Sequence, residues 1–504
     1  MIAKWWLLAF AAGTLEAAVI RGVVVEHMTG KPLMRANVTV LPIPGTPGSI
    51  LSVRTDRFGG FTFSSLAAGA YAVNVGRFGF ATTQYGQKEW KSAGRPIVLE
   101  ASESAFLNVR LRRLGSITGT VVDEEDVGLP DHEVIVYRDT QPPELVTRAR
   151  TDDRGNYRLS GLMPGKYLVR SVGKQYDEGA YLPTFSRETA EAEQALRFEV
   201  NLDEQTNHAN LKPRPGRLIS ISGVVSLSAP GLPMTVTLVN DMGRHEQKGF
   251  SPMVRFRFDN MPPGEYELFG KASDGTPAGA LFSGYRAITA PPGKDVNLSM
   301  QLAEVHGTGV QLRDKKGGAV DLSQIQVLAR TRDLAGAGDT QPIQASPAML
   351  APGRWELALA PNPSYAALEF IGPLYAREPG PAYGWHEIFV TAYPRGARWI
   401  LSNAPAGVRG IVSSPGHDPV AGAPVFLEEI GVDSRKRLIE IHTTRTDLRG
   451  QYHFAGLTPG SYRLLATFEY QMPDSAAMEV ARAQSVRVDD GQVAQLDLEL
   501  YEIR

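Results

Sequence analysis

Two His-Glu pairs come nearest to a metal-dependent hydrolytic site in this sequence of 504 residues. His132-Glu133 and His386-Glu387 each offer an imidazole and a carboxylate, the groups with which zinc peptidases hold a metal and activate water. The zinc motif H-E-x-x-H also needs a second histidine, and neither pair has one. We therefore expect both pairs to lie at strand edges, and we expect neither a metal nor a cofactor.

Carboxylates gather in one further stretch, residues 123–126, where four acidic residues follow one another. Oxygen-rich loops can hold Ca²⁺, but the glycine-spaced ligand pattern of a calcium loop is absent, which favours a solvated turn. Three other aspartates, Asp56, Asp152 and Asp447, each precede a glycine at the same offset. Because an aspartate in this position accepts hydrogen bonds from nearby backbone N–H groups, these three predict turns rather than catalytic carboxylates.

Motifs for nucleophilic catalysis and nucleotide binding are missing from the sequence. It contains no G-x-S-x-G elbow, Walker loop or dinucleotide fingerprint. It contains no cysteine, which excludes disulfides, thiolate metal sites, a catalytic thiol and a lipobox cysteine. The net charge of −2 provides no field that would recruit nucleic acid. We therefore expect no enzymatic activity and no nucleic-acid partner.

Aromatic residues in expected loops are the remaining candidates for a binding function. They lie beside glycine, proline and charged residues, where a flat ring could stack on a sugar or anchor a protein partner. Burial between adjacent domains explains them equally well. The six candidates are Tyr85, Trp90, Tyr181, Phe185, Tyr383 and Trp385.

The elements that would position these residues are read from one repeated stretch, residues 151–169. It combines a T-D-x-x-G turn, an alternating strand, a Pro-Gly turn and a second alternating strand, which predicts two linked β-hairpins. The same stretch recurs from Thr55 and from Thr446, and two degenerate copies retain only the second turn. Five units result, and their anchor aromatics are spaced by roughly the length of one β-sandwich domain. These anchors are Tyr71, Tyr167, Tyr266, Trp355 and Tyr462.

The sequence therefore predicts an all-β protein, a tandem array of about five antiparallel β-sandwiches. Repeat 1 spans residues 18–113, repeat 2 spans 114–214, and repeat 5 spans 407–504. Repeats 3 and 4, at residues 215–303 and 304–406, are degenerate because they lack the T-D-x-x-G turn. Within repeat 2, residues 187–196 have a helix-forming composition, which predicts one short helix.

Residues 1–17 read as a signal peptide. One lysine precedes a short apolar run, which is followed by small residues at a plausible cleavage point. The apolar run is about half of the ~20 residues that a membrane-spanning helix needs. We therefore expect cleavage, no membrane span in the mature chain, and a location that is secreted, periplasmic or at the cell surface.

The motif set I-x-G-x-V-V, T-D-x-x-G-x-[YF] and L-x-P-G-x-Y resembles carboxypeptidase regulatory-like domain repeats of secreted bacterial proteins. This resemblance implies a transthyretin-like (prealbumin-like) sandwich and an extracytoplasmic address. It does not imply peptidase activity, because in metallocarboxypeptidases the catalysis belongs to a separate zinc domain.

These observations favour a non-catalytic, extracytoplasmic protein whose repeats present binding surfaces, as a structural, adhesion or interaction scaffold. The expected ligand is an extracellular protein or a polysaccharide. A dedicated carbohydrate-binding protein that uses the loop aromatics is the alternative. An enzyme whose site is assembled between repeats, from residues distant in the sequence, remains a third reading.

Overall fold

The computed structural model describes residues 17–503, apart from residues 141–142, 230, 274–280, 374–376, 379–383, 392–393, 432–437 and 439–440. Strands dominate the described chain, and they form paired sheets in five successive sandwiches. The all-β class and the tandem transthyretin-like sandwiches that the sequence predicts are confirmed. No helix in the described ranges is long and apolar enough to cross a bilayer.

Repeat 1 shows the basic sandwich. One sheet has the order β4-β1-β8, in which β1 pairs antiparallel with β4 and parallel with β8. The other has the order β3-β2-β5-β6, with β7 also paired to β5. Alternate residues of β1 point into the core, as a half-buried strand requires. The strands are β1 (Ala18–Glu26), β2 (Asn37–Pro42), β3 (Leu51–Arg54), β4 (Gly60–Leu66), β5 (Gly69–Gly76), β6 (Thr83–Gln84), β7 (Ile97–Leu99) and β8 (Ser104–Leu111).

Repeat 2 has the same two sheets, ordered β12-β9-β18 and β11-β10-β13-β16, with β17 also on β13. Its elements are β9 (Gly115–Thr120), β10 (Glu133–Arg138), β11 (Glu144–Arg150), β12 (Asn156–Leu162), β13 (Gly165–Ser171), β14 (Lys174–Gln175), β15 (Ala180–Tyr181), β16 (Thr184–Phe185), the 3₁₀ helix η1 (Ala192–Gln194), β17 (Phe198–Val200) and β18 (Gln205–Thr206).

The short helix expected at residues 187–196 is reduced to the three-residue turn η1. Arg187 and Glu188 have φ values of 65° and 57°, in the left-handed region, so a right-handed helix cannot begin there. The backbone N–H of Leu196 donates to Ser186 Oγ at 2.9 Å, which closes the segment as a compact loop. Helix-forming composition was therefore overridden by the local fold.

Repeat 3 follows the same plan, with sheets β22-β19-β25 and β21-β20-β23-β24-β26. Its strands are β19 (Ile219–Ser226), β20 (Pro233–Asn240), β21 (Gly243–Phe250), β22 (Met253–Met261), β23 (Gly264–Ser273), β24 (Leu281–Ala290), β25 (Val296–Gln301) and β26 (Ala303–Glu304).

Repeat 4 departs from the plan. Its sheets are ordered β28-β27-β36-β33-β34 and β30-β29-β32-β35, with β31 also on β29. Its first strand, β27, therefore pairs with the two-residue strand β28 where the other repeats place a long hairpin strand. The strands are β27 (Val310–Asp314), β28 (Ala319–Val320), β29 (Val327–Asp333), β30 (Gly336–Ala337), β31 (Gln341–Ile343), β32 (Gly353–Leu359), β33 (Ala366–Ile371), β34 (Arg377–Glu378), β35 (His386–Val390) and β36 (Ala397–Ser402).

Repeat 5 returns to the basic sandwich, with β40-β37-β43 in one sheet, β44 also on β37, and β39-β38-β41-β42 in the other. Its elements are β37 (Ala406–Ser413), β38 (Pro424–Glu429), β39 (His442–Arg445), β40 (Gln451–Leu457), β41 (Gly460–Ala466), α1 (Ser475–Val480), β42 (Gln484–Val488), β43 (Val493–Gln495) and β44 (Leu498–Glu499).

The glycine of the I-x-G-x-V-V motif permits the close packing of the first and last segments of a repeat. A Cβ added at Gly22 would lie 2.2 Å from the carbonyl oxygen of Leu107. One added at Gly410 would lie 1.8 Å from the carbonyl oxygen of Leu496. Any larger residue would force these segments apart, so the motif encodes the parallel pairing that holds each of these sandwiches together.

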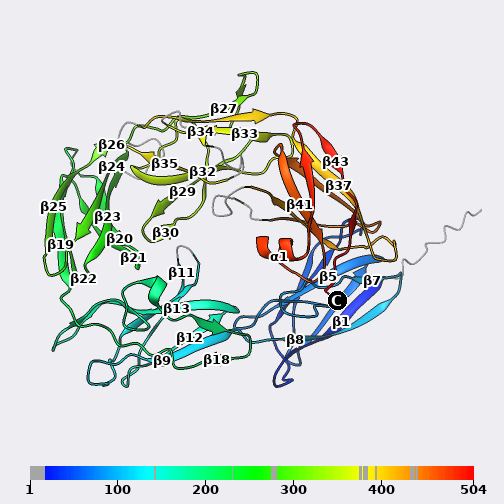
Figure 1. The fold of residues 1–504 in the computed structure, drawn as a ribbon, viewed down its shortest axis with the longest axis horizontal. Coiled ribbons are helices and arrows are strands. Elements are labelled where there is room, and N and C mark those ends of the chain that lie inside the picture. The colour runs from blue at the N-terminus through cyan, green and yellow to red at the C-terminus, as the bar shows by residue number, and fades with distance from the viewer. Residues whose placement is uncertain are drawn as a thin grey trace, which may run out of the picture.

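The five repeats follow one another around a closed ring, in which the blue first repeat lies beside the orange and red fifth repeat (Figure 1). An ion pair of 2.6 to 2.8 Å joins each repeat to the next around the ring. These pairs are Arg112–Asp203, Arg170–Asp241, Arg244–Asp333, Lys315–Asp490 and Lys88–Glu469.

The ring closes where residues 84–96 of repeat 1 dock on repeat 5, a contact called the clasp from here on. The backbone N–H of Ala93 donates to the carbonyl oxygen of Phe468 at 2.8 Å. The backbone N–H of Gln471 donates to the carbonyl oxygen of Lys91 at 2.5 Å. The Ala93 side chain is buried in the hydrophobic core of repeat 5. The clasp therefore combines strand-like hydrogen bonding with apolar burial.

Candidate interaction surfaces

The carboxylates of the turn aspartates accept hydrogen bonds from backbone N–H groups. In repeat 2, Asp152 Oδ1 accepts hydrogen bonds from the N–H groups of Arg154 at 3.0 Å and Asn156 at 2.7 Å. Asp56 and Asp447 accept the equivalent pair of bonds in repeats 1 and 5. The turn glycine of repeat 2 has a φ of 77°, a conformation that glycine adopts without strain. These carboxylates are structural, as the motif predicts.

The threonine before each turn aspartate is also bound to the backbone. Thr55 Oγ1 donates to the carbonyl oxygen of Leu33 at 2.6 Å and accepts from the N–H of Ala36 at 2.8 Å. Thr151 and Thr446 make the same two bonds in their repeats. Sequence reasoning assigned these threonines no role, although their fixed place before the aspartate was a usable signal.

The anchor aromatics form one recurring hydrogen bond. Each ring is buried, and its polar group donates to the backbone carbonyl four residues earlier in the chain. In the degenerate repeat 4, a tryptophan indole N–H replaces the tyrosine hydroxyl and makes the same bond at 2.7 Å. The donors and acceptors are Tyr71 to Ala67, Tyr167 to Met163, Tyr266 to Pro262, Trp355 to Ala351 and Tyr462 to Thr458.

The two His-Glu pairs do not assemble a metal site. His132 immediately precedes β10 and is fully buried, with Nδ1 2.9 Å from the hydroxyl of Tyr176. Burial lowers the pKa of His132 to about 4, so the ring is neutral at physiological pH. His386 begins β35 and stacks on Phe370 with ring centroids 4.0 Å apart. Both imidazole rings therefore contribute to side-chain packing.

The acidic stretch 123–126 forms a turn. Asp123 Oδ1 accepts hydrogen bonds from the N–H groups of Glu125 at 2.9 Å and Val127 at 2.8 Å, as the motif aspartates do. Glu124 accepts from Tyr181, and Asp126 pairs with a lysine. Across the described residues, no group of three or more His, Asp or Glu side chains is arranged to hold a metal ion.

Two of the six aromatic candidates lie in the segment that forms the clasp. Tyr85 is half-buried and packs against the core of repeat 1. Trp90 is half-buried, and Lys91 Nζ lies 5.2 Å from its ring centroid, which suits a cation–π contact. Contact between repeats, the alternative that the sequence left open, therefore accounts for the position of this loop.

Tyr181 belongs to a small aromatic cluster at one end of repeat 2. Its hydroxyl donates to Glu124 Oε2 at 2.9 Å, and its ring meets Tyr176 at 5.9 Å with an interplanar angle of 76°. Burial, with a contribution from Glu124, raises the pKa of Tyr181 to about 12. Part of the ring stays accessible, but the edge-to-face arrangement does not create a flat stacking platform.

Phe185 and Trp385 are buried, with 5% and 7% of their surfaces exposed. Phe185 lies in a cluster that includes Met242 of repeat 3, so it packs at the junction of repeats 2 and 3. Trp385 is covered by Arg330, whose guanidinium carbon lies 3.9 Å from the ring centroid. Neither ring face is free for a ligand. Tyr383 lies outside the described residues.

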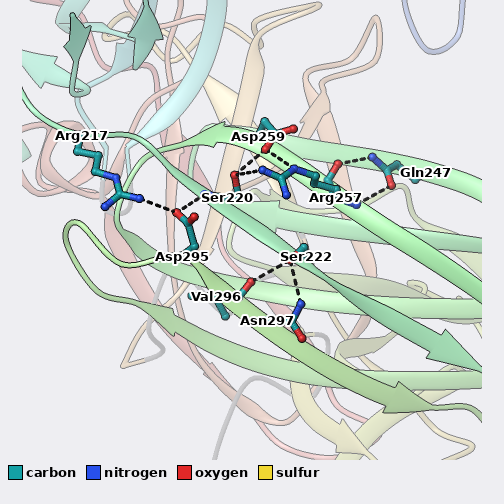
Figure 2. Close-up of polar contacts among 9 residues, drawn as sticks. All are labelled: Arg217, Ser220, Ser222, Gln247, Arg257, Asp259, Asp295, Val296 and Asn297. Atoms are coloured by element: carbon teal, nitrogen blue, oxygen red, sulfur yellow. Dashed lines mark hydrogen bonds and ion pairs between the residues drawn. The ribbon is translucent and has the colours of Figure 1, made fainter.

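A polar network covers part of the surface of repeat 3 (Figure 2). Ser220 Oγ donates to Asp259 Oδ1 at 2.6 Å, and Arg257 Nε donates to the same oxygen at 2.7 Å. These bonds, the one from Ser220 first, lower the pKa of Asp259. Asp295 accepts from Arg217 at 3.4 Å beside them. Because the two arginines are matched by two aspartates, this face reads as a solvated surface.

Comparison with known families shows to which family this chain belongs. The family model described as carboxypeptidase regulatory-like domain matches residues 19–112, 116–203 and 407–501, which is more than half of the chain. The chain belongs to this family. The three matched segments are the regulatory-like repeats that carry the T-D-x-x-G turn, so the resemblance drawn from the motifs is confirmed.

Solved structures give only distant similarities to these regulatory-like repeats. The minor pilin of Streptococcus agalactiae is 14% identical, with 40% of this chain and 97% of that chain covered and a TM-score of 0.26. The shaft pilin of Lactobacillus rhamnosus GG is 12% identical, with 40% and 98% covered and a TM-score of 0.24. The Bacillus anthracis TIE protein is 16% identical with a TM-score of 0.19; the match covers 57% of this chain but only 50% of that one. Similarities this distant carry no argument about function. No curated protein matches the chain at a significant level.

Proposed function

We propose that this protein is a non-catalytic, extracytoplasmic scaffold whose regulatory-like repeats present binding surfaces to a partner. The main support for this proposal is that the recurring polar residues of the repeats form hydrogen bonds to the backbone. The threonine and aspartate of each T-D-x-x-G turn and the anchor tyrosine or tryptophan of every repeat bond to backbone groups. The motif thus builds a rigid frame, and rigid frames position variable loops for binding.

A protein is the favoured ligand, and a polysaccharide is the alternative. Phe185 and Trp385 are buried, and the Tyr176–Tyr181 pair is not coplanar, so the described candidates do not form a platform for sugar rings. Trp90 and Tyr181 keep part of their surfaces accessible and remain the candidates for glycan stacking. The predicted signal peptide supports a location outside the cytoplasm.

Two parallel assays test this proposal. The purified chain is used to capture partners from a native envelope extract, and it is also applied to a glycan array. The variant for both assays is Trp90→Ala with Tyr181→Ala, which alters the two partly accessible rings and spares the buried Trp385. A protein partner that both forms retain supports the scaffold. Glycan binding that the double variant loses supports the carbohydrate-binding alternative.

Catalysis is tested on the same preparation. The chain is incubated with panels of peptide and ester substrates, before and after a second purification. We expect no turnover that follows the protein through repurification. Turnover that persists in proportion to the chain would contradict the non-catalytic proposal.

A further inference from the structure

Two arginines recur at matching places in repeats 1 and 5, and in each repeat they line one cleft. The first directly precedes the close-packed glycine of the first strand, and the second directly precedes the T-D-x-x-G turn. The clefts measure about 440 Å³ in repeat 1 and about 500 Å³ in repeat 5. The arginines are Arg21 and Arg54 in repeat 1, and Arg409 and Arg445 in repeat 5. The same fold therefore brings two cationic groups together twice.

In repeat 5, the strand register fixes the outward position of Arg409. This residue of β37 pairs antiparallel with His453 of β40 and parallel with Gln495 of β43, and all three residues are exposed. Residues that pair in this way share one face of a sheet, so the three form a row across the outer face of repeat 5. The cleft at this row, called the repeat 5 cleft, is also lined by Pro44 of repeat 1. It therefore lies at the junction where the ring closes (Figure 1).

Repeat 2 shows the partner that the second arginine takes. Arg150 precedes the turn there as Arg445 does in repeat 5, and its guanidinium donates to Asp131 Oδ1 at 2.7 Å. Gly422 takes the place of Asp131 in repeat 5, since both residues donate their N–H to the carbonyl oxygen of the turn threonine. The carbonyl oxygen of Gly422 accepts from Arg445 at 2.7 Å instead. A Cβ added at Gly422 would lie 2.8 Å from a side-chain carbon of Pro96 in repeat 1, so the docked clasp leaves no room for an aspartate there.

The repeat 5 cleft holds more positive charge than it neutralises. Arg445 also donates to Gln84 Oε1 at 3.3 Å, so both of its acceptors are neutral. Burial lowers the pKa of Arg445, because its charged form is partly removed from water. Among the described residues, no carboxylate forms an ion pair with Arg409 or Arg445. Asp447 is the one acidic side chain in the described lining, and it already accepts two backbone N–H groups of its own turn.

We propose that the repeat 5 cleft binds a carboxylate carried by an acidic segment of a partner protein, between Arg409 and Arg445. This inference rests on the scaffold function proposed above and names the group that the partner presents. A guanidinium has five N–H donors, and two of those of Arg445 are engaged by Gly422 and Gln84. The remaining donors can hold a carboxylate through paired hydrogen bonds. The ligand supplies the charge that Asp131 supplies in repeat 2.

The rest of the lining favours a peptide over an acidic sugar. Tyr452 is the aromatic residue of the described lining, but its ring is buried and its hydroxyl donates to the carbonyl oxygen of Leu496. The cleft therefore offers no exposed ring face on which a sugar could stack. Ile411 has 39% of its surface exposed and gives an apolar contact beside the arginines, which suits the methylene groups of a glutamate side chain.

A rhodamine-labelled peptide tests the inference on the full-length chain. It carries three consecutive glutamates between glycine and serine residues, and the control peptide carries glutamines instead. Anisotropy titration should give a Kd of about 0.1–1 mM for the glutamate peptide, as expected for a short flexible ligand. The glutamine peptide should bind at least ~10-fold more weakly. Inorganic phosphate presents the same kind of oxygen acceptors, so ~20 mM phosphate should displace the glutamate peptide more than sodium chloride at equal ionic strength does.

Arginine variants locate the binding. Arg409 is exposed and its side chain bonds no described residue, so Arg409→Gln should fold normally and weaken peptide binding about 10-fold. Arg445→Gln should weaken it to a similar extent, and thermal melting confirms that each variant is folded. Arg449→Gln removes the same charge from an exposed residue of this repeat that does not line the cleft, and should leave the Kd unchanged.

Three results of these titrations would overturn the inference. One is an equal loss of binding in all three variants, which would show that only the net charge of the repeat matters. Another is unchanged binding by folded Arg409→Gln and Arg445→Gln. The third is the absence of binding to the wild-type chain at ~10 mM glutamate peptide.

Capture from the envelope extract separates this inference from the function on which it rests. A partner that wild type and Arg449→Gln retain, and that the double variant Arg409→Gln, Arg445→Gln loses, supports both. A partner that the double variant also retains refutes the cleft as its site but leaves the scaffold proposal standing. Retention of no partner by any form counts against the scaffold itself, whatever the peptide does. Displacement of the captured partner by trigalacturonate but not by the glutamate peptide would overturn the assigned ligand class.

Discussion

Replacing Tyr167 with phenylalanine removes one hydroxyl from the core of repeat 2 and keeps the ring. Tyr167 is completely buried, and its hydroxyl donates to the carbonyl oxygen of Met163 at 2.6 Å. The variant loses this bond and leaves a carbonyl without its partner, which costs about 1–2 kcal/mol for a buried neutral pair. The loss should be confined to repeat 2, because the bond joins two residues of the same corner.

Hydrogen exchange followed by mass spectrometry can read this loss repeat by repeat, which a single melting curve of five domains cannot. We expect amides of β10 and β13 to exchange roughly 5- to 30-fold faster, and those of repeats 1 and 5 to be unchanged. Tyr181→Phe is the matched control, because it removes a hydroxyl of the same repeat that bonds Glu124 at the surface. Equal acceleration by both variants, or none by Tyr167→Phe, would refute the corner bond as a stabilising element.

Three further predictions concern repeat 2 and the repeat boundaries. His132 is neutral in the fold, with a pKa of about 4 that lies below the 6.5 of an unfolded histidine. Its contribution to the free energy of unfolding is therefore complete above pH 6.5 and is lost as the pH falls toward 4. Repeat 2 should lose about 2 kcal/mol of stability between pH 7 and 5, and a stability that does not change with pH would contradict this. Asp152→Ala should speed exchange in β11 and β12, because two N–H groups lose their acceptor; unchanged exchange would show that the turn does not need the carboxylate. Limited proteolysis should release fragments that end near residues 113, 214, 303 and 406, and fragments that ignore these positions would count against the predicted boundaries.

The sandwiches could be predicted because their signals are local. Alternating strands, an aspartate before a turn glycine and a Pro-Gly turn act within about twenty residues, and the repeat makes each signal count several times. The helix at residues 187–196 was overestimated, because composition does not show the left-handed residues Arg187 and Glu188. The short helix α1 was missed, although Asp474 caps it by accepting from the N–H of Ala477 at 2.7 Å.

The candidate surfaces were harder to predict, because they depend on contacts between distant parts of the chain. The loop around Trp90 was singled out as a candidate binding surface, but its docking on repeat 5 involves residues more than 370 positions away, which the sequence does not indicate. Likewise, the sequence shows that repeats 3 and 4 lack the T-D-x-x-G turn but not what takes its place beside the first strand. In repeat 3 Ser251 and Pro252 bond to this region, and in repeat 4 the short strand β28 pairs with β27. Loop aromatics such as Phe185 are ambiguous for the same reason.

The clasp is the contact on which the closed ring depends, because it joins the first repeat to the fifth. The chain has no cysteine, so two can be introduced without interference. Lys91 and Gln471 share a backbone hydrogen bond, from the N–H of Gln471 to the carbonyl oxygen of Lys91, which brings their backbones close enough for a disulfide to bridge them.

Oxidation of the double variant Lys91→Cys, Gln471→Cys should therefore give a cross-linked monomer in high yield, detected by its altered mobility on a non-reducing gel and by the joined peptides in mass spectrometry. The control pair Lys91→Cys, Lys316→Cys, which places the second cysteine on repeat 4, should stay reduced under the same conditions. A closed ring predicts this intramolecular bond at dilute protein concentration. Cross-linking only between molecules, or equal yields for the two pairs, would contradict it.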